Sequence, residues 1–420
     1  MSDARRQDKL PEPLRPGLPT RALLAAVAVG LLARLAFGFL YWTDQPLTRD
    51  EQEYLSLSRS LAAGHGFTYD AAMRAGAIEP FGRAPGYPVF LALIGGGRDV
   101  PSSVPTSVKA AQAAVGGIGV WMVGILAYRL AGRRAAVWAA AIAAVYPPLV
   151  WIAGYALSEG LFWPIGLLVA WWFDRAMTTP RPLKWAVSCG ALIGLGILIR
   201  PALVFFVPLA VLLLLTRRQI LPLAGLVLGV VLVVSPWTWR NYQHHGRLMF
   251  VASEGGVTFW TGNHPLAIGD GDLAANLPIK LDDQRFRAEH PGLNEEQLEP
   301  LYYREALAWM RAHPLEWIQL EFRKLFYLVV PVGPSYTLHS MRYYALSVLS
   351  YVSVLILALG ALGRVRLGAT PGLWLLAGSA VLVALVFFPQ ERFRIPILDP
   401  TLVILAGSAL ASFIRPSARA

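Results

Sequence analysis

Long apolar runs separated by short polar connectors make up most of this chain. A helix needs about 20 predominantly apolar residues to cross the hydrocarbon core of a bilayer, so these runs indicate membrane-spanning helices. They lie at about residues 21–42, 107–129, 135–152, 157–173, 185–199, 202–216, 219–237, 344–362, 372–388 and 397–414. A shorter apolar piece at 86–97 is more typical of an interfacial segment. The pattern predicts an all-α polytopic membrane protein with about ten spans.

The polar stretch after the first span has the pattern of a separate helix. Thr48 and Glu51 have the spacing of a capping box, which satisfies free amides at a helix start. Gly64 is a suitable stop. Apolar residues recur between these points at helical spacing, at Tyr54, Leu57 and Leu61. We therefore predict a helix at the membrane surface.

Asp50 lies on this predicted helix one turn before Tyr54, on the same face as the apolar residues. A carboxylate in that place is held at a membrane surface and faces inward, where it can accept a proton or bind a metal. The alternative is that Asp50 and Glu51 only complement the helix dipole, because acids are favourable in the first turn of a helix.

The largest polar segment covers 238 to about 322 and is rich in turn-forming residues. It closes with a predicted helix at 301–313, which restarts after Pro314. We expect the second helix, at about 315–334, to lie at the interface, although a membrane span is the alternative. The sequence divides into an N-terminal transmembrane catalytic module (1–237, with a first outer loop at 44–105), an outer loop region (238–322) and a C-terminal part of interfacial and transmembrane helices (323–420).

The composition agrees with membrane insertion. Hydrophobic residues make up 55% of the 420 residues and charged residues only 15%, whereas a soluble protein carries about 25% charged residues. The mean hydropathy is +0.49. The net charge of +11 comes from short basic clusters between spans, which is the positive-inside pattern and does not indicate nucleic-acid binding. It predicts both termini in the cytoplasm and the long polar loops outside.

Polar residues gather on the predicted outside face. They are Asp50, Glu51, Arg83, Glu159, Arg200, Arg240, Asn263 and the run at 390–394. A transporter more often places ionisable groups near mid-membrane, along its pathway. The asymmetry therefore favours chemistry or capture at the outer face.

Other chemical motifs are weak. Cys189 is the only cysteine, which excludes a disulfide within the chain. Asp270-Gly271-Asp272 has the form of a metal-binding DxD motif, but its glycines are more typical of a turn. The sequence has no zinc-ligand spacing, no Walker A sequence and no GxGxxG that opens a helix. No cofactor is therefore predicted with certainty, and a divalent metal stays an alternative.

Several segments together resemble the GT-C membrane glycosyltransferases, in particular bacterial relatives of the dolichyl-phosphate-mannose–protein mannosyltransferases (glycosyltransferase family 39) and of the lipid A aminoarabinose transferase. The segments are DEQEYLSLSRSLAAGHGF (50–67), RAPGYP (83–88), YPPLVWIAGYALSEGLFW (146–163), GILIRPALVFFVPL (196–209), RNYQHHGRLMFVASEGGVTFWTGNHP (240–265) and ERFRIPIL (391–398). Their order along the chain, more than any single segment, gives the resemblance.

This resemblance implies an inverting transferase at the outer face of a bacterial inner membrane. Its donor would be a sugar on a polyprenyl phosphate or diphosphate, and its acceptor a lipid, a glycan or a protein. In the family, an acid of the first outer loop deprotonates the acceptor hydroxyl or organises the donor. Asp50 matches that acid, and Glu159 matches the second acidic position of the family.

We expect Asp50, Glu51 and Glu159 to supply the catalytic acids. A leaving phosphate needs fixed positive charge, and arginine forks bind phosphate oxygens well. The candidates for binding the donor phosphate or the substrate are Arg83, Tyr54, Arg200, Arg240, Lys324, Arg392 and Arg394.

Several arginines also have structural alternatives. Arg83 can pair with Glu79, and Arg392 or Arg394 can pair with Glu391. Arg200 and Arg240 begin or end spans, where an arginine can simply anchor the helix at the interface.

The alternative function is a lipid-linked sugar flippase or transporter. Such a protein needs polar residues that continue through the bundle, and the predicted spans contain few. A glycan ligase or polymerase that uses a diphosphate lipid is a further alternative, and so is a noncatalytic assembly subunit.

Overall fold

Helices form every regular element in the part of the chain that the structure describes. In this computed structural model that part is residues 17–70, 73, 82–96, 101–333, 340–365 and 367–413. An apolar helical segment occurs at each of the ten predicted spans. These are α1 (Thr20–Ala36) with the π-turn η1 (Phe37–Tyr41), α5 (Thr106–Ala131), α6 (Arg133–Val145), α8 (Ser158–Thr178), α9 (Pro182–Ile199), η3 (Pro201–Phe205) with α10 (Phe206–Thr216), α11 (Ile220–His245), α17 (Met341–Leu362), α18 (Pro371–Val386) and α20 (Asp399–Phe413).

Five of these helices are long and apolar enough to cross a membrane by themselves: α1 with η1, α5, α9, α11 and α17. A sixth span results if α6 is counted with the short helices that follow it. The segment from η3 to α10, α18 and α20 are apolar but shorter, and α8 carries Glu159, Asp174 and Arg175 near its ends. The protein is thus a polytopic helical membrane protein, as predicted.

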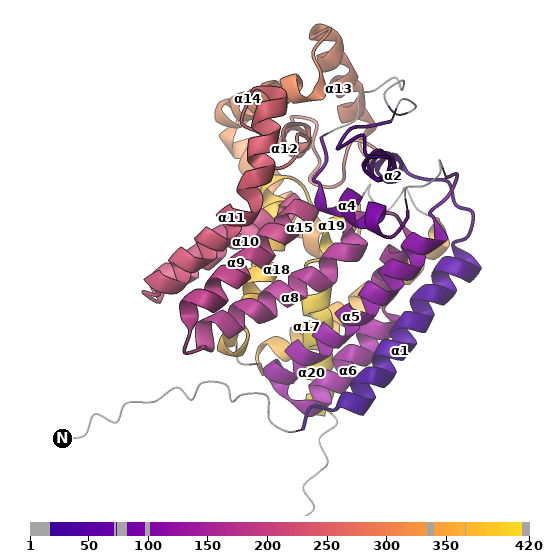
Figure 1. Ribbon diagram of the computed structural model, residues 1–420, viewed down its shortest axis with the longest axis vertical. Helices are drawn as coiled ribbons and strands as arrows, with labels where there is room; N and C mark the ends of the chain where they lie inside the picture. Colours follow the sequence, from indigo (N-terminus) through magenta and orange to yellow (C-terminus); the bar gives the residue numbers. More distant parts are fainter. Residues whose placement is uncertain are drawn as a thin grey trace, which may run out of the picture.

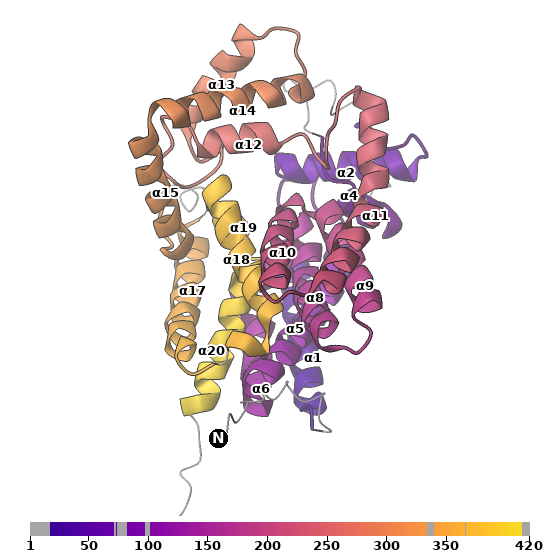
Figure 2. The same cartoon turned by 90° about the vertical axis from the view of Figure 1, so that its left-hand side faces the viewer.

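The bundle has one end that carries additional helices (Figures 1 and 2). There, α2 (Arg49–Ala62) and α4 (Gly86–Leu93) lie beside α12 (Gly255–Gly262), α13 (Leu277–Glu289) and α14 (Glu295–Ala312). We call this the domain end. The first residues of α1 and the last residues of α20 lie at the opposite end of the bundle.

The predicted helix after the first span is confirmed as α2. Its capping box is formed, since the Thr48 N–H donates to the Glu51 carboxylate (2.8 Å) and the Glu51 N–H donates to the Thr48 hydroxyl (3.4 Å). The helix ends at Ala62, and Gly64 follows with a φ of 77°. The apolar piece predicted at 86–97 forms α4, which packs under α2 through the Tyr54–Tyr87 contact.

The outer helices have a small hydrophobic core of their own, which includes Trp260, Phe286, Leu298 and Tyr302. The helix predicted at 301–313 is confirmed as α14 and begins six residues earlier than predicted, at a second capping box between Asn294 and Gln297. As expected, a new helix starts at Pro314. This is α15 (Pro314–Val329), which connects the outer helices to α17 (Figure 2).

The span predicted at 135–152 is not one straight helix, because the chain breaks after α6 and bends by 60° into α7 (Pro147–Trp151) and η2 (Ile152–Gly154). Pro147 and Pro148 have no N–H to donate to the carbonyls of Ala143 and Ala144, which lie four residues earlier. The buried Arg34 of α1 donates to both carbonyls instead, at 3.3 and 3.4 Å. The break can therefore persist inside the bundle, where free carbonyls are costly.

Small residues allow α9 and α11 to approach closely. Gly190 and Gly194 are four residues apart on α9, and Gly225 and Gly229 have the same spacing on α11. A Cβ on Gly190 would lie 2.0 Å from the Leu226 carbonyl oxygen, and one on Gly229 would lie 2.1 Å from that of Val187. The pair thus has the small-xxx-small packing common in membranes.

We expect Gly190→Ala to destabilise the protein by about 1–3 kcal/mol, because the added methyl group collides with backbone atoms. The matched control is Gly360→Ala on α17, where a Cβ would meet no atom within 4 Å. The measurement is the thermal unfolding midpoint of each variant in detergent. Equal midpoints for the two variants would contradict this account of the helix contact.

Candidate functional site

Two helix beginnings meet at the domain end, those of α2 and α8. The Glu51 carboxylate completes the capping box of α2 and also accepts the N–H of Ala156 at 2.8 Å, just before α8. Glu51 is buried. This carboxylate therefore holds together the two segments that carry Asp50 and Glu159.

Asp50 lies between two arginines from distant parts of the chain. Its Oδ1 contacts Nη2 of Arg83 at 2.6 Å, and its Oδ2 contacts Nη1 of Arg392 at 2.5 Å. Arg83 precedes α4, and Arg392 lies on α19 (Glu391–Arg394), a single turn between α18 and α20. The side chain of Asp50 stays 28% exposed.

Arg83 is buried and surrounded by acids. Besides Asp50, it contacts Glu53 at 2.6 Å and Glu254 at 2.5 Å, and its guanidinium lies 5.3 Å from the centre of the Tyr54 ring. Arg83 is 7% exposed and Glu53 is fully buried. Burying such charges is costly unless they are paired, so Arg83 and its acids depend on one another.

A second arginine pair surrounds Glu159, which is fully buried at the start of α8. Its Oε1 contacts Nη1 of Arg200 at 2.9 Å and also accepts a hydrogen bond from Nε of Arg392. Arg200 also donates to the Ser158 hydroxyl at 3.2 Å, while its buried Nε has no hydrogen-bond partner. Arg392 is 27% exposed and thus connects Glu159 to Asp50.

These seven side chains form one charge network: Asp50, Glu53, Arg83, Glu159, Arg200, Glu254 and Arg392. It has four acids and three arginines, and Arg49 adds a fourth arginine through its contact with Glu53 at 3.0 Å. The network joins α2, the approach to α4, the start of α8, the end of α9, the approach to α12, and α19. It is the largest concentration of paired charge at the domain end among the described residues.

Burial of Asp50 would raise its pKa, but the neighbouring guanidinium groups of Arg83 and Arg392 reverse this effect and hold the pKa well below the usual range. Asp50 is therefore ionised at neutral pH. Burial of the Glu53 carboxylate, in contrast, raises its pKa in spite of Arg83.

Five of the predicted site residues are members of the charge network: Asp50, Glu159, Arg83, Arg200 and Arg392. Tyr54 lies among them, with its ring against Arg83 and its hydroxyl 3.5 Å from the Ser158 oxygen. Glu79, the expected partner of Arg83, lies outside the described residues.

Three predicted phosphate-binding residues lie elsewhere. Arg240 is half-buried at the end of α11, next to the rings of Trp237 and Phe67. Lys324 is fully buried on α15 and donates to Asn263, Glu321 and Leu385.

Arg394 lies two residues after Arg392 and pairs with Asp399 at 2.8 Å. Glu391 accepts a hydrogen bond from Ser347. The predicted pairing of Glu391 with Arg392 is not formed, because α19 directs the two side chains to different neighbours.

Sequence reasoning missed three members of the site: Glu53, Glu254 and Ser158. Glu53 could have been found, since it lies three residues after Asp50 and thus on the same helix face. Nothing near Glu254 in the sequence indicates its contact with Arg83, 171 residues away. Among the described residues, no three His, Cys, Asp or Glu side chains are placed to hold a metal ion.

Part of the chain matches a known protein family. Residues 83–239 match the family model for dolichyl-phosphate-mannose-protein mannosyltransferase. This range contains Arg83, Glu159 and Arg200. No curated protein matches the sequence.

Among solved structures, the chain is similar to the oligosaccharyltransferase AglB of Archaeoglobus fulgidus. The complex of AglB with an inhibitory peptide and a dolichol-phosphate has a TM-score of 0.50 at 16% identity, over 93% of this chain and 50% of AglB. The complex with a tethered acceptor peptide has a TM-score of 0.52 at 16% identity, over 93% of this chain and 49% of AglB. This chain thus spans about half the length of AglB.

ArnT of Cupriavidus metallidurans bound to undecaprenyl phosphate is also similar, with 17% identity over 94% of this chain and 78% of ArnT, at a lower TM-score of 0.43. The AglB similarity shows a shared fold. Together with the family match, it confirms the resemblance to the GT-C superfamily that the sequence indicated.

We expect Arg83→Met to destabilise the protein by about 3–5 kcal/mol, because it removes the buried guanidinium partner of Glu53 and leaves only the exposed Arg49 beside that carboxylate. Arg59→Met is the control, since the Arg59–Asp70 ion pair is partly exposed and such pairs contribute about 0–1 kcal/mol. Thermal unfolding in detergent measures both. If the Arg59 variant lost as much stability as the Arg83 variant, the charge network would not be a principal source of stability.

Proposed function

We propose that this GT-C-fold membrane protein is a glycosyltransferase that transfers a sugar from a polyprenyl-phosphate donor to an acceptor hydroxyl at the domain end. The observation that carries the proposal is the partly open ion pair between Asp50 and Arg392. It offers a carboxylate and a guanidinium side by side, and these are the two groups that such a transfer requires.

Asp50 is the general base in this proposal. It is ionised, and 28% of its side chain is exposed, whereas Glu53 and Glu159 are fully buried. Asp50 takes the proton of the acceptor hydroxyl, whose oxygen forms the new bond to the anomeric carbon. The bond from that carbon to the donor phosphate breaks, its electron pair stays on the phosphate oxygen, and the configuration inverts. Glu51 and Glu159 have supporting roles, because both side chains are buried.

Arg392 and Arg200 bind the donor phosphate in this proposal. Arg392 is partly exposed, and Arg200 has a buried Nε without a partner. Arg83 is less suited, since Asp50, Glu53 and Glu254 surround its guanidinium. Fixed guanidinium groups would stabilise the charge that develops on the leaving phosphate.

The comparisons support a lipid-linked donor. AglB shares the fold, and one of its structures holds a dolichol-phosphate. The family model that covers residues 83–239 is named for a dolichyl-phosphate-mannose donor. The acceptor would be a lipid, a glycan or a protein. The basic connectors at the opposite end of the bundle favour a cytoplasmic position for both termini and a periplasmic domain end in a bacterial inner membrane.

Replacement of the base tests the reaction directly. In membranes supplied with radiolabelled polyprenyl-phosphate sugars, we expect Asp50→Asn to lower the transfer rate by about 10²- to 10⁴-fold. The control is Glu289→Gln, which removes an exposed acid of α13 and should transfer at the wild-type rate. Full transfer by Asp50→Asn would exclude Asp50 as the base. Wild-type protein that moves labelled lipid across the bilayer without transfer would instead be a flippase.

Binding of undecaprenyl phosphate tests the phosphate site without turnover. We expect Arg392→Ala and Arg200→Ala each to raise the dissociation constant about 10- to 100-fold, because each removes a charge-assisted hydrogen bond worth about 1.5–3 kcal/mol. Arg240→Ala should bind like the wild type. The assignment fails if Arg240→Ala weakens binding while Arg392→Ala does not.

A further inference from the structure

The end of α18 is held by two side chains from outside that helix. The last carbonyl groups of a helix have no donors within it. Here Lys324 of α15 donates to the Leu385 carbonyl at 2.8 Å, and the Asn263 amide donates to the Val386 carbonyl at 2.9 Å. These two carbonyls immediately precede the four residues 387–390, which we call the α18–α19 link.

The two side chains also bind each other. Lys324 donates to the Asn263 oxygen at 3.1 Å, and that oxygen accepts a second hydrogen bond from Trp317 at 3.2 Å. The Asn263 amide also donates to Phe259 of α12 at 2.8 Å, and Lys324 contacts Glu321 at 2.7 Å. Lys324 and Asn263 are both buried. Their hydrogen bonds join the three helices α12, α15 and α18 at one place.

The segment around Asn263, from Gly262 to Asp272, holds the link itself. Gly262 packs against the Phe387 backbone, since a Cβ there would lie 1.9 Å from the Phe387 oxygen. The Gly271 N–H donates to the Pro389 carbonyl at 3.3 Å, and the Gln390 amide donates to Asp272 at 3.1 Å.

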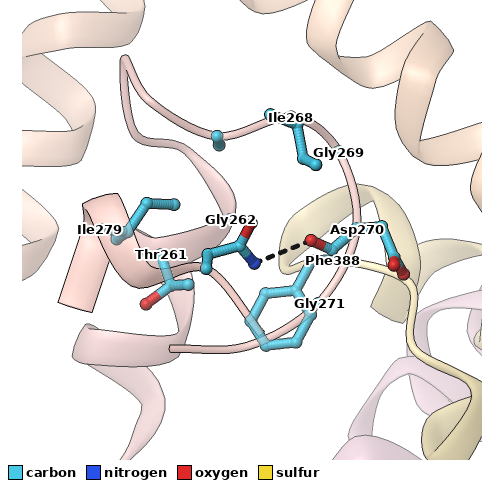
Figure 3. A pocket seen from close by; sticks show the side chains of 10 residues that line it. Thr261, Gly262, Ile268, Gly269, Asp270, Gly271, Ile279 and Phe388 are labelled. Atoms are coloured by element: carbon cyan, nitrogen blue, oxygen red, sulfur yellow. Dashed lines mark hydrogen bonds between the residues drawn. The ribbon is translucent and has the colours of Figure 1, made fainter. Parts of the chain in front are cut away.

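Figure 3 shows Phe388 beside Thr261 and Asp270, within the loop that runs from Ile268 to Gly271. Gly269 and Gly271 adopt φ values of 101° and 80°, and the Asp270-Gly271-Asp272 motif lies in a bent, non-helical loop. The Asp272 side chain contacts the α18–α19 link through Gln390.

Arg392 lies two residues after this link, on the single turn of α19. A single turn cannot fix its own position. The placement of the Arg392 guanidinium between Asp50 and Glu159 therefore depends on the position of the link. A shift of about 1 Å in a group that binds a reacting substrate can lower activity about 100-fold.

We propose that Asn263 and Lys324 are positioning residues for Arg392. They fix the end of α18 and, with the Gly262–Asp272 segment, hold the α18–α19 link so that Arg392 reaches Asp50 and Glu159. α15 thereby helps to set the geometry of the charge network without contributing a residue to it. The donor-binding part of the test rests on the proposed function, and the structural part does not.

The structural part is amide hydrogen exchange in purified protein without donor. We expect residues 387–396 to exchange about tenfold faster in Asn263→Ala and in Lys324→Met than in the wild type, because the end of α18 loses the hydrogen bonds that fix the start of the link. Gln390→Ala is a milder variant that removes only the contact with Asp272. Asp283→Asn is the control, since it removes the negative charge of the Arg287–Asp283 ion pair in the outer helices and does not contact the link. Unchanged exchange at 387–396 in all three test variants would overturn the proposal.

The functional part is a double-mutant cycle read by binding of undecaprenyl phosphate. Asn263→Ala should weaken binding about tenfold in the wild-type background and have no effect in the Arg392→Ala background, because its influence passes through Arg392. Asp283→Asn should have the same effect in both backgrounds. Equal effects of Asn263→Ala in both backgrounds would contradict positioning and indicate general destabilisation. If the wild type bound no polyprenyl phosphate, the proposed function would fail, and the exchange experiment would still decide the positioning role.

Discussion

The ion pair between Asp50 and Arg392 is the contact on which the domain end depends. It joins residues 342 positions apart in the chain, and each partner also connects to a buried ion pair. Taking a carboxylate or a guanidinium out of water costs several kcal/mol, which only a well-placed partner offsets. Glu53 and Glu159, which are fully buried, can therefore stay charged only if Arg83, Arg200 and Arg392 arrive from other parts of the chain. The helices that carry them must then meet in one arrangement.

The break between α6 and α7 serves the same arrangement. The chain bends by 60° there and continues through α7 and η2, after which Ala156 donates to Glu51 and α8 begins with Glu159 at the network. Two prolines cause the break, and the carbonyl groups that they leave free are satisfied by Arg34. By stabilising the bend, the buried Arg34 of α1 thus influences the position of the charge network.

The sequence predicted the features that depend on neighbouring residues. Hydropathy located all the apolar helices, and the capping box located the start of α2, because each signal lies within one segment. Glu254 and the contacts of Lys324 could not be predicted, since they depend on segments that only the tertiary fold brings together. Lys324 and Arg240 have the same local pattern as Arg392, a cation beside apolar residues at a membrane rim. These three cations differ in the residues that they contact in the fold. A contact with a residue distant in sequence leaves no pattern in the local sequence.

The acids around each arginine also explain why Arg83 and Arg392 differ in their ability to bind a phosphate. Arg83 has three carboxylates around one guanidinium and is 7% exposed, so an incoming phosphate would have to displace an acid from a buried site. Arg392 shares its guanidinium between Asp50 and Glu159 and keeps an exposed edge, and guanidinium groups can bind a further oxygen in their own plane. An anion that approached Arg392 would weaken its hold on Asp50, because both compete for the same positive charge. Binding of a phosphate and release of a carboxylate are therefore coupled by the geometry of this one side chain.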